Sequence, residues 1–107
     1  MFQQTIRAMF EMKQNAETVT KESLRNCRFA TEDVLPAVAD RQIRRYSAER
    51  ATTLGNGYHG KVDIYFQTAD GTTKRVQTTV WATDADFLTL KAGASLPLRS
   101  VLGFDFY

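Results

Sequence analysis

The sequence predicts an α+β fold in which two N-terminal helices precede an antiparallel β-meander of four to five strands. Apolar residues recur at steps of three and four as far as Gly55, and after Gly57 they alternate with polar ones. Short turns containing Gly or Asp separate the alternating stretches. A chain of 107 residues fits a single domain, here residues 1–107, with a helical part over 1–55 and the β-meander over 58–107.

The first helix is predicted over residues 2–27. The stripe residues of this helix are Phe2, Ile6, Met9, Lys13, Ala16, Thr20, Leu24 and Cys27. Thr18, Val19 and Thr20 are β-branched, which lowers helix propensity, and Asn15 is an acceptable N-cap. The stretch is therefore either one continuous helix or two helices with a break near these residues.

The second helix is predicted to begin near Thr31 to Asp33 and to end at Gly55. Asp33 can cap the backbone N–H groups, and Pro36 then falls in the first turn, where its missing N–H costs nothing. The residues that share one face are Leu35, Val38, Ala39, Ile43, Tyr46 and Leu54. Arg50 falls inside this apolar arc, so it must either extend to the edge or meet a carboxylate.

The β-meander begins with a strand in which Val62, Ile64 and Phe66 point one way and Tyr65 points the other. The turn Ala69–Thr72 follows, where Gly71 can take the positive φ that a hairpin needs.

A second strand is predicted over residues 73–82, with Trp81 opposite the face of Val76 and Val80. A turn at Thr83–Asp86 leads to a strand over 87–91, and the remaining strands lie between Ser95 and Phe106. The sheet then either lies open under the helices or curls into a small barrel. The helices are expected to cover the Val76 face, which leaves Tyr65 and Trp81 exposed together.

The charge and cysteine content narrow the class of protein. Fourteen basic and 12 acidic side chains give a net charge of +2, which permits nucleic-acid binding without suggesting it. Cys27 is the single cysteine, so an internal disulfide is excluded and a reducing compartment fits best. No apolar run reaches the length of a signal peptide or the ~18 to 20 residues of a membrane span. These features predict a cytoplasmic protein.

Four features of the sequence could carry chemistry, but a structural interpretation fits each of them better. Gly55–Gly60 matches G-x-G-x-x-G, but it leaves a helix and enters a strand, whereas a dinucleotide-binding loop follows a strand and opens a helix. His59 is the only histidine, so a histidine-based metal or acid–base site would need partners from elsewhere in the chain. Asp84 and Asp86 are typical of a solvated turn. Cys27 lies on the apolar stripe of the first predicted helix, so we expect its thiol to be buried and unreactive. No set of nucleophile, base and orienting group can be assembled, so we expect no enzyme, no cofactor and no metal.

The candidate partner-binding residues combine exposed aromatic rings with positive charge. They are Trp81, Tyr65, Arg41, Arg44, Arg45, Lys74 and Arg75. Rings that stack on bases and cations that contact phosphates would suit single-stranded nucleic acid. Protein interfaces are enriched in the same residue types.

Four segments carry a resemblance to known proteins: Arg50–Asn56 (RATTLGN), Lys61–Phe66 (KVDIYF), Thr78–Ala82 (TTVWA) and Leu90–Val101 (LKAGASLPLRSV). Over roughly the second half of the chain they resemble small uncharacterised bacterial proteins, a family that implies no activity and no functional residues. The strand order and the closing Leu-x-Leu-x-Ser-Val stretch also look like Sm-type small barrels, including the family that binds the Rho transcription terminator. That second resemblance implies an RNA or RNA-factor surface, although the RNA-contacting signatures of Sm proteins are not recognisable in this chain.

The expected function is that of a non-enzymatic protein-interaction or self-association module, so the partner is a protein or a second copy of the chain. RNA or single-stranded nucleic-acid binding is the alternative. An enzyme whose site forms only between subunits is the third hypothesis.

Overall fold

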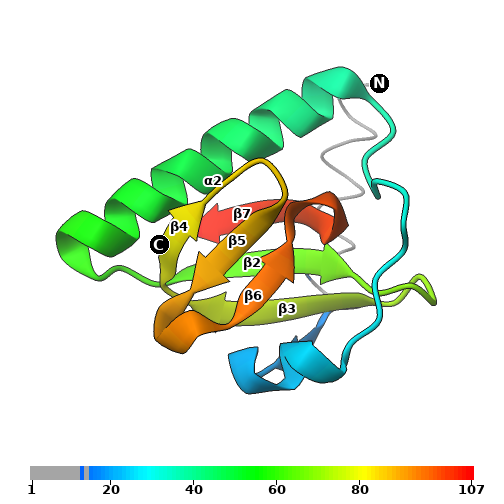
Figure 1. Ribbon diagram of the computed structural model, residues 1–107, viewed down its shortest axis with the longest axis horizontal. Helices are drawn as coiled ribbons and strands as arrows, with labels where there is room; N and C mark the ends of the chain where they lie inside the picture. Colours follow the sequence, from blue (N-terminus) through cyan, green and yellow to red (C-terminus); the bar gives the residue numbers. More distant parts are fainter. Residues whose placement is uncertain (1–12, 14) are drawn as a thin grey trace.

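The computed structural model describes residue 13 and residues 15–107 as one long helix and two small sheets (Figure 1). The first sheet has four strands in the order β1-β3-β2-β7, and the second has three in the order β4-β5-β6. The elements are, in chain order, β1 (Glu17–Val19), η1 (Lys21–Asn26), α2 (Val38–Tyr58), β2 (Val62–Gln67), β3 (Thr73–Thr78), β4 (Val80–Thr83), β5 (Phe87–Leu90), η2 (Lys91–Gly93), β6 (Ser95–Pro97), η3 (Leu98–Ser100) and β7 (Val101–Phe106). The α+β class is confirmed.

The predicted strand over 73–82 is divided at Thr79, where the chain passes from the four-stranded to the three-stranded sheet. Val76 and Val80, which lie on either side of Thr79, are both fully buried in the core. The chain returns through η3 to β7, which pairs antiparallel with β2. The single meander of four to five strands is therefore wrong: six strands follow α2, and they belong to two sheets. Over residues 15–107 the sheets do not close into a barrel.

The core lies between the two sheets and under α2, which contacts both β4 and β7 (Figure 1). The predicted inner face of the strands is confirmed, because its five apolar members are fully buried: Val62, Ile64, Phe66, Val76 and Val80. Leu88 and Leu90 of β5 and Leu96 of β6 complete the opposite wall.

The two predicted turns are confirmed. Gly71 has φ +86° in the hairpin between β2 and β3, and Asp70 Oδ1 accepts hydrogen bonds from the Thr68 hydroxyl (2.5 Å) and the Thr72 N–H (3.1 Å). Between β4 and β5, Asp84 Oδ1 accepts from the N–H groups of Asp86 and Phe87, each at 2.8 Å.

The helix α2 begins five residues after Asp33 and ends three residues after Gly55, so both predicted boundaries are wrong. Pro36 disfavours the helical conformation at Leu35, and the helix starts only beyond it. At the other end, His59 takes the left-handed conformation (φ 53°) and its N–H donates to the Gly55 carbonyl at 3.1 Å.

The face of α2 that packs on the sheets is also different from the predicted one. It carries Arg44, Ala48, Ala51 and Gly55, all buried, whereas most of the predicted apolar face is exposed. Small side chains allow the helix backbone to approach the sheet closely: a Cβ added at Gly55 would overlap the Val80 carbonyl oxygen. The residues Val38, Ile43 and Tyr46 are consequently left on the surface.

The predicted N-terminal helix over 2–27 lies partly outside the described residues, and from residue 17 onward it is wrong. Glu17–Val19 forms β1, which runs parallel to β3, and Lys21–Asn26 forms a 3₁₀ helix. The β-branched run Thr18, Val19 and Thr20 favours the extended backbone, and pairing with β3 satisfies its hydrogen bonds.

Candidate protein-contact surface

The two aromatic residues of the predicted site do not share a surface. Trp81 lies on β4 in the three-stranded sheet with 43% of its area exposed, as predicted. Tyr65 lies on β2, inside the four-stranded sheet, and is only 2% exposed, so its predicted exposure is wrong. The central strand β2 is buried on both faces, since Asp63 is also only 8% exposed. Tyr65 pairs with Arg75 of β3, and hydrogen bonding with Tyr65 raises the pKa of Arg75.

The five predicted basic residues lie on two separate elements, α2 and β3, and each has a partner in the chain. Arg41 and Arg44 contact Asp33, and Arg45 lies 3.8 Å from a Glu49 carboxylate oxygen. On β3, the Lys74 Nζ lies 3.2 Å from a Glu17 carboxylate oxygen, and Arg75 donates to the Thr18 hydroxyl. The structure therefore does not bring them together as one unpaired basic surface.

Arg44, one of the predicted partner-binding residues, is buried on the inner face of α2. Its two terminal nitrogens donate to the two Asp33 oxygens at 2.8 and 2.6 Å. One of them also donates to the Val101 carbonyl at 3.1 Å, which ties α2 to the start of β7. A carboxylate held in this fork geometry compensates the buried guanidinium, so Arg44 acts in folding and is not accessible to a partner.

Burial raises the pKa of Asp33, but hydrogen bonds from Arg44 and the Leu35 N–H, with the charges of Arg44 and Arg41, outweigh it and hold the pKa below its ordinary value of 3.8. Asp33 is therefore ionised at neutral pH, as the ion pair requires.

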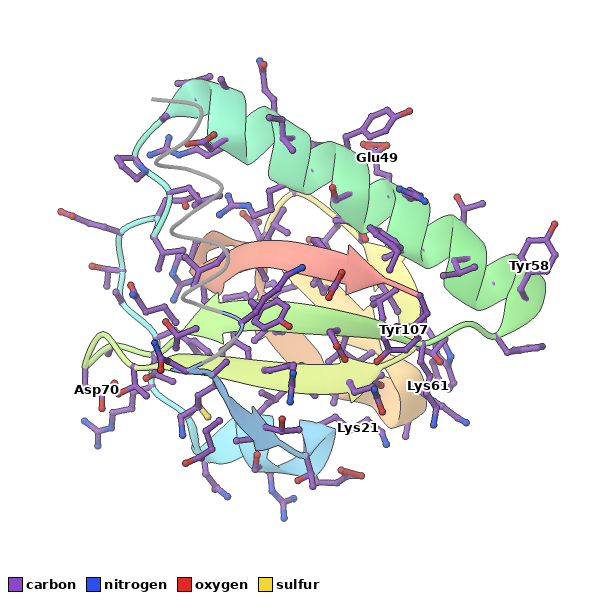
Figure 2. All side chains as sticks on the ribbon, turned by 180° about the vertical axis from the view of Figure 1, so that it is seen from behind. Lys21, Glu49, Tyr58, Lys61, Asp70 and Tyr107 are labelled. Atoms are coloured by element: carbon purple, nitrogen blue, oxygen red, sulfur yellow. The ribbon has the colours of Figure 1, made fainter. Side chains whose placement is uncertain are left out.

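An open groove lies between α2 and the end of β7, with a volume of about 470 Å³. We call it the aromatic groove, and its lining residues are Tyr46, Glu49, Arg50, Thr53, Leu54, Tyr58, Phe106 and Tyr107. Tyr46, Tyr58 and Tyr107 are 76%, 79% and 74% exposed. Figure 2 shows Tyr58 at the end of α2 and Tyr107 at the tip of β7, at the same end of the molecule. Three large rings that keep most of their area in solvent are a surface feature typical of protein interfaces.

Arg50 lines the aromatic groove, with its guanidinium carbon 4.3 Å from the centre of the Phe106 ring. The prediction that Arg50 extends to the edge or meets a carboxylate missed this contact, because the partner ring is 56 residues away in the sequence. A guanidinium stacked on a ring has lost part of its rotamer freedom in advance, which lowers the cost of ordering it in a complex.

Tyr107 is held in place at its hydroxyl, although its ring is exposed. The hydroxyl donates to Asp63 Oδ1 at 2.6 Å, and the Gln77 side-chain amide donates to the hydroxyl. Burial of the hydroxyl and its bond to the Asp63 carboxylate raise the pKa of Tyr107. The chain end thus presents a fixed ring on one side of the aromatic groove.

The residues considered for metal binding or catalysis, His59, Asp84 and Cys27, make local contacts within the fold. His59 is the left-handed residue after α2, and Asp84 caps a turn. The half-buried Cys27 thiol donates to the Ser23 carbonyl at 3.7 Å. Within residues 15–107 no three His, Cys, Asp or Glu side chains are grouped as metal ligands would be. No helix in that same range combines the length and the apolar character needed to cross a bilayer.

Comparison of the chain with protein-family models, with curated proteins and with solved structures finds no match.

Proposed function

We propose that this protein is a non-enzymatic interaction module that binds a protein chain through the aromatic groove. The observation that carries the proposal is the placement of Tyr46, Tyr58 and Tyr107 around one hollow, each with about three quarters of its area exposed. Tyrosine supplies large contact area with few rotatable bonds, and the hydroxyl satisfies its own hydrogen bonding at a partly wet interface.

The distribution of exposed apolar side chains supports the same surface. Seven large hydrophobic residues are exposed in residues 15–107, and five of them lie on α2 or at the chain end beside it: Val38, Ile43, Tyr46, Tyr58 and Tyr107. The other two, Trp81 and Phe87, lie on the three-stranded sheet. The predicted partner surface around Trp81 is thus smaller than the surface along α2.

Nucleic-acid binding remains the alternative, and the charges favour protein. The aromatic groove contains one cation, Arg50, which lies against Phe106, and one carboxylate, Glu49. A surface that tracks a phosphate backbone combines its rings with several unpaired cations.

Photo-crosslinking tests the proposal. We expect benzoyl-phenylalanine in place of Tyr58, in the full chain produced in cells, to give discrete adducts that protease removes and nuclease leaves intact. The matched control carries the same group at Asp70, which lies on the hairpin at the opposite end of the molecule (Figure 2). Adducts at Asp70 equal to those at Tyr58, or none at either position, would contradict the proposal. Adducts at Tyr58 that nuclease removes would replace it with the nucleic-acid alternative.

A further inference from the structure

The side of α2 that borders the aromatic groove carries a regular stripe. Ile43, Tyr46, Arg50 and Leu54 follow one another at steps of three, four and four, which places them on one line along the helix. We call these four residues the outer stripe. Ile43 and Tyr46 are 65% and 76% exposed and belong to the large exposed hydrophobic residues of the described range 15–107. Arg50, in contrast, lies on Phe106, and Leu54 packs against the core. The 21 residues of α2 span about 31 Å, so the helix offers a straight surface long enough for a second helix.

We infer that the partner of this surface is a second copy of the chain, with α2 packed antiparallel on α2 of the copy. The inference rests on the proposed function and names its partner. A two-fold contact requires a surface that complements itself, so that each residue meets a suitable residue of the other copy.

The outer stripe meets this requirement when the two-fold axis passes near Ala48. Tyr46 and Arg50 lie two residues on either side of that position, so each Tyr46 ring comes opposite Arg50 of the other copy. One face of the Arg50 guanidinium lies on Phe106, at 4.3 Å from the ring centre. Its second face can then receive Tyr46 of the copy, giving a cation between two rings.

The charges of the outer stripe favour the antiparallel direction. In an antiparallel contact about this axis Arg50 comes opposite Tyr46 of the copy, and the two Arg50 side chains are offset along the helices. A parallel contact would instead place Arg50 beside Arg50 and Glu49 beside Glu49, and like charges at an interface are unfavourable.

A stable interface takes about 800 Å² from each partner, which is roughly a ninth of the 6926 Å² surface of this chain. The outer stripe and the aromatic groove adjoin along α2 and share Tyr46, Arg50 and Leu54. One copy can therefore cover the stripe and the near side of the groove together.

Sedimentation equilibrium of the full chain over a range of concentrations tests the inference. We expect the wild type to approach twice the 12.1 kDa mass of the chain, and Tyr46→Ala to raise the dissociation constant at least ~10-fold, as loss of a central aromatic contact does. The matched control is Trp81→Ala, which removes an exposed ring of the three-stranded sheet and should change the constant less than ~2-fold.

A wild type that stays monomeric at the highest concentration would overturn the inference, as would a dimer that Trp81→Ala weakens and Tyr46→Ala does not. If the pure chain is monomeric while Tyr58 crosslinks a different protein in cells, the inference falls and the proposed function stands. If neither dimer nor crosslink forms, both fall.

Discussion

Replacing Arg44 by methionine is expected to cost roughly 3 kcal/mol of the free energy of unfolding. The change removes one partner of a buried ion pair, so that the Asp33 carboxylate and the Val101 carbonyl lose the hydrogen bonds that Arg44 donates. The expected loss is at the low end for buried pairs for two reasons. The Asp33 side chain is 18% exposed, and Arg41 Nε lies 3.6 Å from Asp33 Oδ2. Urea unfolding followed by far-UV circular dichroism measures the difference.

Arg45→Met is the matched control, because Arg45 is the next residue of α2 and its pair with Glu49 is exposed. We expect it to change the free energy of unfolding by no more than about 0.5 kcal/mol.

The dependence of stability on acid pH gives a second check of the Arg44–Asp33 ion pair. The pKa of Asp33 is lowered in the folded state, so its stabilisation is present above the ordinary value of 3.8 and is lost as pH falls through the lower folded pKa. The gap between wild type and Arg44→Met should narrow in that range, and a gap that is constant with pH would contradict the assigned ion pair.

Gly55→Ala is expected to destabilise the protein by roughly 2 to 3 kcal/mol, although alanine is the better helix former. The added Cβ would overlap the Val80 carbonyl oxygen and approach the Thr79 side chain, so α2 and β4 would have to separate. A backbone atom cannot move aside as a flexible side chain can. Thermal unfolding of the variant and the wild type measures the cost.

Gly57→Ala provides the control two residues further along the same helix. Nothing lies within 4 Å of a Cβ at this position, so the variant should gain about 0.5 to 1 kcal/mol from helix propensity alone. The opposite signs separate close packing from propensity. If Gly55→Ala were as stable as Gly57→Ala, the close approach of α2 to β4 would be disproved.

The strands β2, β3 and β5 were predictable because their sequences carry local signals. Alternation places Val62, Ile64 and Phe66 on one side, and Gly71 and Asp84 mark turns by local chemistry. The division into two sheets was not predictable, because the residues on either side of the bend at Thr79 keep alternating as one long strand would. The packing of the core decides where the chain leaves one sheet and enters the other.

The orientation of α2 could not be predicted because hydrophobicity favours the wrong face. Ile43 and Tyr46 are more apolar than Ala48 and Gly55, yet only the small residues allow close contact with β4. Arg44 is buried on the same side because Asp33, from the preceding loop, supplies its counter-charge. Such a pairing between loop and helix leaves no periodic signal.

Sequence reasoning found part of the candidate surface. It placed Tyr46 on an apolar face and singled out Arg50 as unusual, but it did not connect either residue with the chain end. Tyr58 and Tyr107 become part of the aromatic groove only because β7 returns beside α2. The useful signal was that the apolar residues of α2 lie on a different face from the four residues that pack on the sheets.

The accessibility of single cysteines on α2 tests the central claim most directly, namely that small residues of α2 face the sheets and the tyrosine side faces a partner. Tyr46→Cys and Ala48→Cys would each be made in a chain whose Cys27 is replaced by alanine. Their rates of thiol labelling would be compared with those of the urea-unfolded chains, at concentrations low enough to keep the protein monomeric. Tyr46 is 76% and Ala48 0% exposed, so we predict labelling close to the unfolded rate at position 46 and at least ~100-fold protection at position 48. Equal rates at the two positions, or protection at 46 in the dilute monomer, would contradict this orientation of the helix and the contact surface built on it.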